Sequence, residues 1–564
     1  MQVALSYRSR SRVLDRGGNR LVAMQPNLAR EEVALVASLR QPLRFREAIS
    51  ALHDVVVSDL RYKKRDKSAY EAFRAERERQ ERAIHRDGVE AYDRADGGQT
   101  RELVREQRQA FKRAVSDYWR HRDRFRDDVR KNDPDLWRAI MPLDPVVTVA
   151  DDVVTFECFS ADESSYGCLT LDRNGLDAQS DVALGTTNVD YSWALYDHFQ
   201  TLRSYRDTRL HIAPEGFGAV TETGGGEAAH FEQKIDLPES WLQGFLQVQA
   251  ATAMPLKRVS LSRDCVYSLL AFMKRNRPRT SPRALRLELQ TGQPARLVLE
   301  PWERAFDSRS GPYLGPPCEP IRLWGTRRLM FLHRILPLAE RFDVYLLGTG
   351  LPSFWVAHLG EMRLTIGNSG WTDNDWTGGS AIDAMRPPVE VTAAQLDAAA
   401  AVLREQRRLR RDALPAALGC EPAAALARVD ALAHRGQVIY DLHDEVYRYR
   451  SILPPELAQT QIGRPNPQRV QAEQYLANNV IRDRRVEDLG DGRVAITGKI
   501  AWITPRVVVD ADGVIVDGAC ECDHHRRAGL RRGPCGHLIA LRDAGERPTA
   551  DAWYRRMTQW ASAN

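Results

Sequence analysis

The sequence lacks the features that direct a protein into a membrane or an oxidising compartment. Only eight of its 564 residues are cysteine, and five of these are scattered, as is typical of reduced, buried thiols in an intracellular protein. No early segment joins a basic start to the apolar run of a secretory signal. The best candidate for a membrane span, 329–347, contains five ionisable residues, too many for such a helix. We therefore expect a cytoplasmic protein.

Lysine is scarce as well, with 9 residues against 72 arginines. The 81 basic and 76 acidic side chains leave a net charge of only +5, which does not by itself indicate nucleic acid binding in a chain of this length. Any basic surface must therefore be local. The 43% of hydrophobic and 28% of charged residues are close to globular averages, and the length predicts about three to five folded units.

Familiar catalytic motifs are also missing. The sequence contains no G-x-x-x-x-G-K-[ST] phosphate loop, no G-x-S-x-G nucleophile turn and no H-E-x-x-H zinc motif. Two acidic groups could still hold Mg²⁺ or act as acid and base: Glu157 with Asp162 and Glu163, and the run 373–375. Because Asp and Asn are ordinary turn residues, turn chemistry is the favoured interpretation of both groups.

What the sequence does contain is a dense group of metal-type ligands near its C-terminal end. The pattern is C-x-C-x12-C-x-H, and its four residues are Cys520, Cys522, Cys535 and His537. Three thiolates and one imidazole suit Zn²⁺, which binds such ligands tetrahedrally, and four protein ligands leave no position open for water. The sequence thus predicts a closed, structural zinc site. His524 or His525 could replace His537, but both follow Cys522 so closely that we interpret them as loop residues.

The flanking residues predict how these ligands are presented. Segments 493–500, 506–510 and 514–516 have strand patterns, and the third would deliver Cys520. The apolar run 538–541 indicates that the second ligand pair opens a helix.

Together, the two ligand pairs and the small sheet before them resemble the SWIM zinc-finger family over about Tyr475 to Ala544. The resemblance implies a bacterial-type multidomain member with a zinc-stabilised module, associated in the family with DNA binding or protein contacts. It implies no reaction. Some bacterial members accompany AAA-type ATPases, so such an ATPase is a further candidate partner.

Two sets of arginines are candidate contacts for nucleic acid or a protein partner. The first forms a predicted exposed loop between the two ligand pairs: Arg526, Arg527, Arg531 and Arg532. The second lies on the third helix of a winged helix-turn-helix predicted over 392–451, in which three helices precede a two-stranded wing. Its exposed face offers Arg428 and Arg435 but also acidic residues, so DNA reading and protein docking remain equal alternatives for this helix.

The expected fold class is multidomain α+β. An N-terminal α/β segment spans 1–60, a charged helical hairpin 61–138, and a β-rich domain 139–385, in which turn residues separate short strands. A winged-helix-like domain spans 386–455 and the zinc module 466–564. The arginines of the hairpin could contact a partner, but interleaved aspartates favour a solvated helix.

An identifiable binding module without an identifiable catalytic one favours a zinc-binding adaptor that holds nucleic acid, DNA foremost, or a protein partner. The first alternative is a nuclease or transposase-like enzyme with an acidic site in the β-rich domain. The second is an accessory subunit of an AAA-type ATPase system.

The adaptor hypothesis predicts that the purified protein has no ATPase, nuclease or protease turnover. Its closed zinc site would leave no position at which to activate water. DNA and RNA cleavage should be assayed with Mg²⁺ and Mn²⁺, comparing wild type with Asp162→Asn and Asp373→Asn. Cleavage that disappears in either variant would replace the adaptor with the nuclease.

Overall fold

The computed structural model describes the chain in segments. These are 12–16, 19–23, 33–58, 145–178, 182–188, 208–213, 216–222, 239–278, 283–370, 391–451, 467–490, 492–511 and 513–544, with short pieces within 109–132, 196–204 and 375–386. Two compact units are present, one made of Met1–Asp59 with Pro142–Asn564 and the other of Leu60–Met141. The predicted hairpin falls in the second unit and lies outside the described residues, apart from isolated positions.

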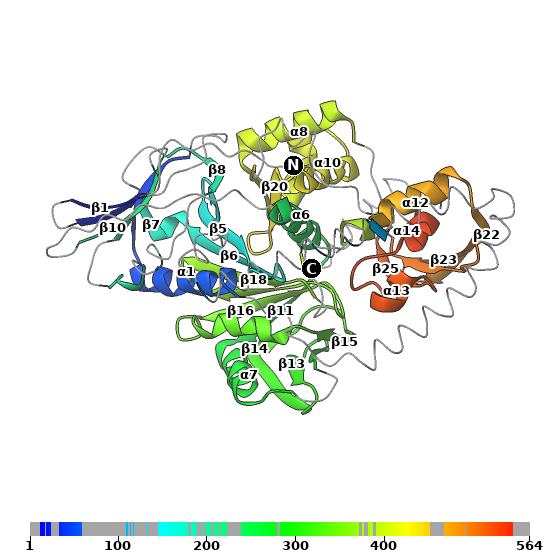
Figure 1. Cartoon of the computed structure of the whole chain (residues 1–564), viewed down its shortest axis with the longest axis horizontal. Coiled ribbons are helices and arrows are strands. Elements are labelled where there is room, and N and C mark those ends of the chain that lie inside the picture. The colour runs from blue at the N-terminus through cyan, green and yellow to red at the C-terminus, as the bar shows by residue number, and fades with distance from the viewer. Residues whose placement is uncertain are drawn as a thin grey trace. The chain divides into compact units, whose positions relative to one another are not determined.

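The first unit is a mixture of helices and several small antiparallel sheets, in agreement with the coarse prediction (Figure 1). Its largest sheet has eight strands in the order β11-β16-β17-β18-β6-β5-β4-β8. Their bounds are Lys257–Ser262, Arg341–Leu346, Ser353–His358, Met362–Asn368, Ser165–Asp172, Val153–Phe159, Val146–Val149 and Gly185–Asn188. Most of the described residues in these strands are buried, in keeping with the apolar runs in their sequences.

Two further sheets complete the β-rich part. The six-stranded sheet has the order β1-β2-β10-β9-β3-β7, with bounds Arg12–Arg16, Asn19–Ala23, Gly216–Glu222, Thr208–Ala213, Leu35–Leu39 and Leu176–Ala178. The four-stranded sheet has the order β14-β13-β12-β15, with bounds Arg304–Pro312, Pro294–Leu299, Leu285–Leu289 and Cys318–Leu323. Because β3 pairs with β9, the N-terminal segment shares a sheet with the β-rich region.

Within the described residues, three α-helices accompany these sheets: α1 Pro42–Val56, α6 Glu239–Thr252 and α7 Arg263–Arg275. Helix α1 packs on β5 and β6. A side chain at Gly167 of β6 would lie 2.8 Å from Leu52 Cδ1, so the glycine allows the helix to approach the sheet. Residues 257–262, directly before α7, form β11, because Val259 and Leu261 alternate into the core.

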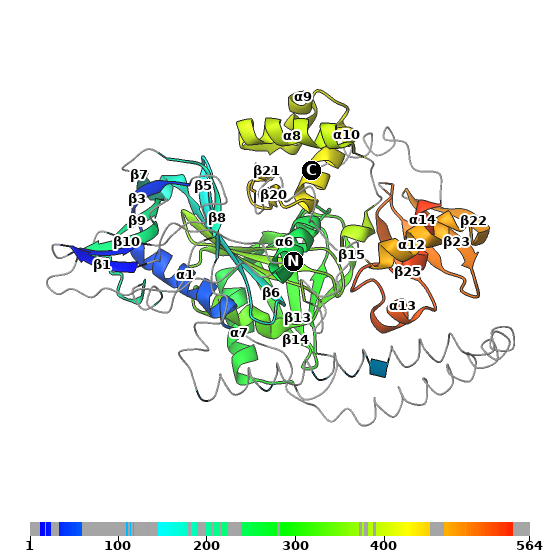
Figure 2. The same ribbon diagram turned by 45° about the horizontal axis from the view of Figure 1, so that its top comes forward.

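A helical unit follows, in the predicted order of three helices and a hairpin. Its elements are α8 Ala393–Gln406, β19 Arg408–Arg410, α9 Leu414–Leu418, α10 Pro422–His434, β20 Val438–Asp441 and β21 Val446–Tyr449 (Figure 2). Thr392 and Gln395 form a reciprocal capping box that fixes the start of α8. The short β19 extends the hairpin to three strands and was not predicted.

Helix α10 is packed on more than one side. It contacts α8, α9 and also α6, and its buried residues include Leu426, Ala427 and Val429, which do not share one helical face. A helix that is apolar nearly all round is a core helix. Arg428 and Arg435 are therefore only half-exposed, in contrast to the prediction of an exposed face.

In the part of the chain that the structure describes, residues 467–544 combine a four-stranded sheet with three helices. The sheet has the order β22-β23-β24-β25, with bounds Ile481–Gly490, Arg493–Ile500, Arg506–Val509 and Ile515–Ala519. The helices are α12 Pro467–Ala477, α13 Asp523–Ala528 and α14 Gly536–Asp543. No helix within the described part of the chain is long and apolar enough to cross a membrane.

A buried ion pair ties the end of β21 to β5. Arg450 and Glu157 are each no more than 2% exposed and form a salt bridge through Nη1 and Oε2. Tyr166 donates a 2.5 Å hydrogen bond to Oε1 of the same carboxylate, and the Arg450 guanidinium lies over the Phe245 ring. Removing one partner would leave the other charged and buried.

We therefore expect Arg450→Met to lower the free energy of unfolding by about 3–5 kcal/mol. The matched control is Arg40→Met, which removes an ion pair to Asp177 between side chains that are about half-exposed and should therefore cost much less. Urea unfolding followed by tryptophan fluorescence measures both, since Trp355 is buried in the large sheet. An equal loss of unfolding free energy in the two variants would contradict a stabilising role for the buried pair of Arg450 and Glu157.

Candidate metal centre

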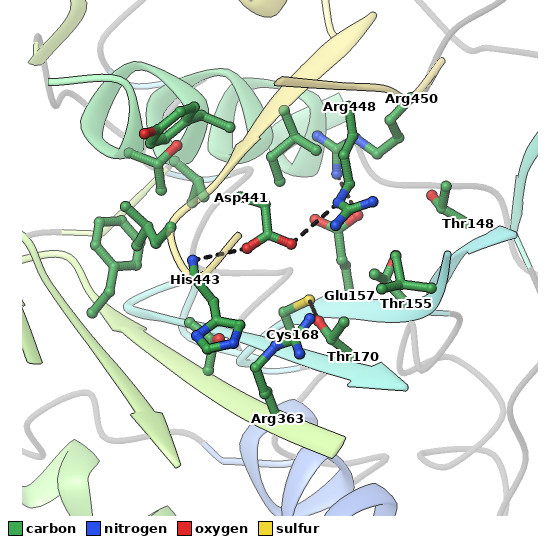
Figure 3. A pocket seen from close by; sticks show the side chains of 18 of the residues that line it. Thr148, Thr155, Glu157, Cys168, Thr170, Arg363, Asp441, His443, Arg448 and Arg450 are labelled. Atoms are coloured by element: carbon green, nitrogen blue, oxygen red, sulfur yellow. Dashed lines mark hydrogen bonds and ion pairs between the residues drawn. The ribbon is translucent and has the colours of Figure 1, made fainter. Parts of the chain in front are cut away.

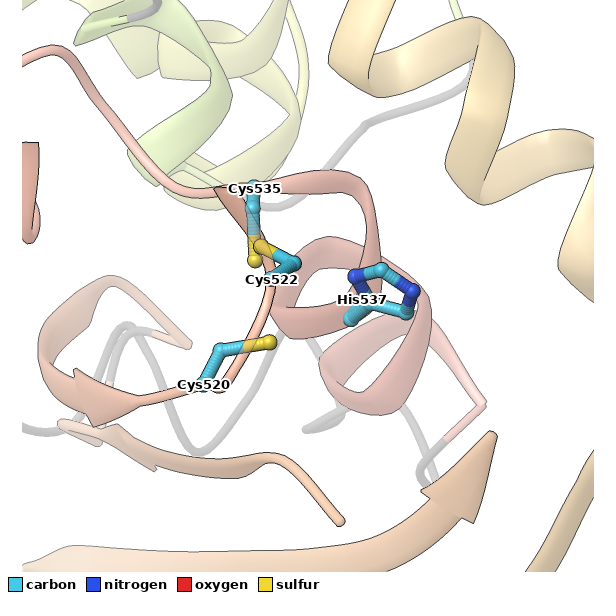
Figure 4. Close-up of side chains that lie close together, drawn as sticks. All are labelled: Cys520, Cys522, Cys535 and His537. Carbon is cyan, nitrogen blue, oxygen red and sulfur yellow. The ribbon is translucent and has the colours of Figure 1, made fainter. Parts of the chain in front are cut away.

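Three short elements bring the predicted metal ligands together. Strand β25 ends at Ala519 and delivers Cys520. Cys522 is the N-cap of α13, and Cys535 is the N-cap of α14, which places His537 in the first turn of that helix (Figure 4). The prediction that the second ligand pair opens a helix is confirmed.

The side chains of these four residues form a compact donor set. Their ligand atoms all lie within 4.8 Å of one another. Cys520, Cys535 and His537 are buried, and Cys522 is half-buried. The Nδ1 atom of His537 is buried without a hydrogen-bond partner, which is costly unless a metal ion accepts its lone pair. The donor set fits a structural zinc ion, which would supply fixed tetrahedral bonds and no chemistry of its own.

The thiols influence one another strongly. Hydrogen bonding with Cys520 lowers the pKa of Cys522 well below its ordinary value, and hydrogen bonding with Cys520 and Cys522 raises the pKa of Cys535 far above it. The cluster thus already stabilises a thiolate at one position, and thiolate is the form that binds a metal.

Helix α12 supplies outer contacts that the sequence did not reveal. The Nε2 atom of His537 lies 3.0 Å from the Tyr475 hydroxyl, which also accepts a 2.9 Å bond from Gln471 Nε2. Gln468 Oε1 accepts a bond from the backbone N–H of Gly536. A hydrogen bond at one ring nitrogen fixes the orientation of the other, so Tyr475 directs Nδ1 toward the thiols.

The two spare histidines lie beside the cluster and are not part of it. His524 Nε2 lies 3.3 Å from the Gly533 carbonyl oxygen. The backbone N–H of His525 donates to Cys522 Sγ, and burial lowers the pKa of its imidazole. Both positions agree with their interpretation as non-ligands.

The predicted basic loop is partly a helix. Arg526 and Arg527 lie on α13 and are exposed, and Arg532 is exposed beyond it. Arg531 is half-buried, donates a 2.7 Å hydrogen bond to the Ala528 carbonyl, and has its pKa lowered by burial. The prediction of four exposed arginines is therefore wrong for this residue, whose side chain packs against Gly350.

The acidic groups do not converge in the described residues. Asp162 accepts hydrogen bonds from Ser160 and Ser164 within the β5–β6 turn, as turn chemistry predicts. Glu157 is held by Arg450 instead. Asp373 lies outside the described residues.

A cavity of about 70 Å³ lies between the large sheet and the β20–β21 hairpin. Its lining includes five threonines, Thr148, Thr155, Thr170, Thr252 and Thr365, beside His443 and the charged residues Glu157, Arg363, Asp441, Arg448 and Arg450 (Figure 3). Arg363 pairs with Asp172 and Asp444, and Arg448 pairs with Asp152, Asp441 and Asp444. No local sequence pattern marks this site, because its charged residues come from distant segments.

Comparisons with known proteins give a limited result. No family model and no curated protein match the chain. Among solved structures, proliferating cellular nuclear antigen from Entamoeba histolytica matches with 10% identity and a TM-score of 0.29, over 40% of this chain and 89% of that one. The PCNA2–PCNA3 complex from Sulfolobus tokodaii matches with 8% identity and a TM-score of 0.31, over 41% and 91%. A structure of the C-terminal region of FEN-1 bound to A. fulgidus PCNA matches with 12% identity and a TM-score of 0.29, over 42% and 94%. Similarity at this level defines neither a family nor a function.

The contact between Tyr475 and His537 predicts a specific loss of metal affinity. Tyr475→Phe keeps the ring but removes the hydroxyl, and loss of such an outer contact weakens metal binding by about tenfold or more. Competition with a chromophoric zinc chelator measures the change. Tyr267→Phe, at a tyrosine that is 58% exposed, is the control. Unchanged affinity in Tyr475→Phe would limit Tyr475 to a packing role.

Proposed function

We propose that the protein is a zinc-binding adaptor whose C-terminal module is of the SWIM type and holds nucleic acid. The Cys₃His cluster supports the first part of the proposal, because its donors suit zinc and no water position remains. The resemblance in ligand pattern supports the assignment to SWIM modules. The basic surface of the module supports the choice of partner.

The observation that carries this choice is the pairing of β22 with β23. Arg482 lies directly opposite Lys499 and Arg485 opposite Thr497, so these side chains share one face of the sheet. Arg482, Arg485 and Lys499 are all exposed. Like charges directly opposite each other destabilise a sheet, whereas a phosphate backbone lying across them would relieve the repulsion.

Further features of the module suit the same partner. Trp502, in the turn after β23, is 85% exposed and could stack on an unpaired base. Arg526 and Arg527 of α13 add a second basic surface, and Asp523 pairs with Arg527 at 3.1 Å between exposed side chains, a contact of little energy. The strand register places two carboxylates, Glu487 and Asp517, on the same face of the sheet as these basic residues. The positive charge is therefore concentrated at the end of the sheet that contains Arg482.

The helical unit keeps the element order of a winged helix, but we assign it to protein docking. Its third helix is covered by α6 and α8, and its wing is held on the large sheet through Arg448 and Arg450. DNA reading would need the third helix to enter a groove. An AAA-type ATPase remains a predicted partner on the resemblance alone.

Replacing basic residues of the module should weaken nucleic acid binding without releasing zinc. We expect Arg482→Ser/Arg485→Ser/Lys499→Ser, and separately Arg526→Ser/Arg527→Ser/Arg532→Ser, to lower affinity and to reduce the salt slope by about one per lost phosphate contact. Fluorescence anisotropy with labelled single-stranded and duplex DNA and RNA measures both quantities, with zinc content determined in parallel.

A matched control removes exposed arginines elsewhere, in Arg304→Ser/Arg309→Ser on β14. Affinity that is insensitive to salt and equal in all variants would overturn nucleic acid as the partner and leave a protein partner for the module.

A further inference from the structure

A second cluster of metal-type side chains lies where the β20–β21 hairpin meets the large sheet. Asp343 comes from β16 and His358 from the end of β17, and His443 lies in the turn between β20 and β21. We propose that these three residues bind a divalent transition-metal ion, independently of the C-terminal cluster. This site does not depend on the proposed adaptor function.

The spacing of the three side chains meets the same limit as the Cys₃His cluster. One ligand atom from each residue lies within 4.8 Å of the others. Asp343 and His358 are buried and His443 is half-buried. The Nε2 atom of His358 lies 2.8 Å from Asp343 Oδ2, and the two imidazole rings meet edge to face with centroids 4.9 Å apart. Small side-chain rotations would bring all three onto one ion.

The strongest indication of a missing ligand is on His443. Its Nδ1 atom is buried and has no hydrogen-bond partner, while its Nε2 atom lies 3.8 Å from Asp444 Oδ1. A lone pair without a hydrogen-bond donor on one ring nitrogen suits a metal-binding histidine, and the Asp444 carboxylate lies near the other nitrogen, beyond direct hydrogen-bond distance. A metal ion would satisfy the buried nitrogen, which otherwise costs free energy.

Asp343 has the outer contacts expected of a ligating carboxylate, and also a competitor. Ser260 Oγ donates a 2.6 Å hydrogen bond to Oδ1, which holds the carboxylate in place. Arg258 donates a 2.9 Å bond to Oδ2, the oxygen that faces His358. The Arg258 side chain is 44% exposed, so it can withdraw into solvent when an ion takes its position. Arg341 lies farther away, at 3.8 Å.

The donor set indicates the class of ion. Two imidazoles and one carboxylate favour zinc, cobalt, nickel or ferrous iron over magnesium and calcium, which prefer oxygen, and over cuprous copper, which prefers sulfur. Three protein ligands leave a coordination position for water or a small molecule. His443 also lines the cavity of about 70 Å³, so an exogenous ligand has space beside it. This distinguishes the site from the closed Cys₃His cluster.

Metal counting on the full chain tests the proposal. After loading with zinc and removal of the excess, elemental analysis should give two ions per chain in the wild type. We expect one in His443→Ala, one in Asp343→Asn, one in Cys522→Ala, and none in Cys522→Ala/His443→Ala. The control His333→Ala, at an exposed histidine, should keep two.

Cobalt separates the two sites spectroscopically. In wild type, thiolate-to-cobalt charge transfer reports the Cys₃His cluster, and visible bands without charge transfer report the second site. His443→Ala should lose only the latter. If Asp343→Asn does not fold, the zinc count of His443→Ala alone tests the proposal. His443 lies in a turn, where a substitution is less disruptive to folding than in a buried strand. One ion in wild type and an unchanged count in His443→Ala would overturn the proposal and leave a hydrogen-bonded cluster of Asp343 and His358.

Discussion

Three buried arginines of the eight-stranded sheet and the β20–β21 hairpin hold the central part of the molecule together. Arg363, Arg448 and Arg450 are each at most 5% exposed, and all of their carboxylate partners come from other strands or turns. A buried charge without its partner costs several kcal/mol. If the hairpin left the sheet, the arginines and their carboxylate partners would be exposed to water or left buried without a partner. The cavity and the position of His443 both depend on this constraint.

The C-terminal module is organised differently, around a few soft ligands. Helices α13 and α14 have only six and eight residues, too few to be stable alone. Cys522 and Cys535 occupy their N-cap positions, and the Cys522 sulfur accepts a hydrogen bond from the backbone N–H of His525 at the start of α13. Arg542 of α14 is buried and donates to the carbonyls of Ala384 and Met385, so the module is also anchored to a segment well upstream.

Local patterns were readable in the sequence, and long-range ones were not. The strand pattern over 493–500 located β23 with the observed bounds, and the cysteine spacing located the candidate metal ligands, since both signals lie within a few residues. Strand β22 was missed because its ten residues are almost all exposed and mostly charged, which removes the hydrophobic period. Tyr475 was missed as an outer contact because it lies 62 residues before His537. Nothing local marks such a pair.

The ion pair between Glu157 and Arg450 joins residues 293 positions apart. A ribosome releases the chain from its N-terminal end, and domains generally fold as they emerge. Strands β5 and β6 thus leave the ribosome long before the arginine that neutralises Glu157 has been made. Until then, this carboxylate must remain hydrated or protonated, so the sheet stays open on that side during synthesis. Strands β5 and β6 are thus completed by a residue that is translated 293 positions after Glu157.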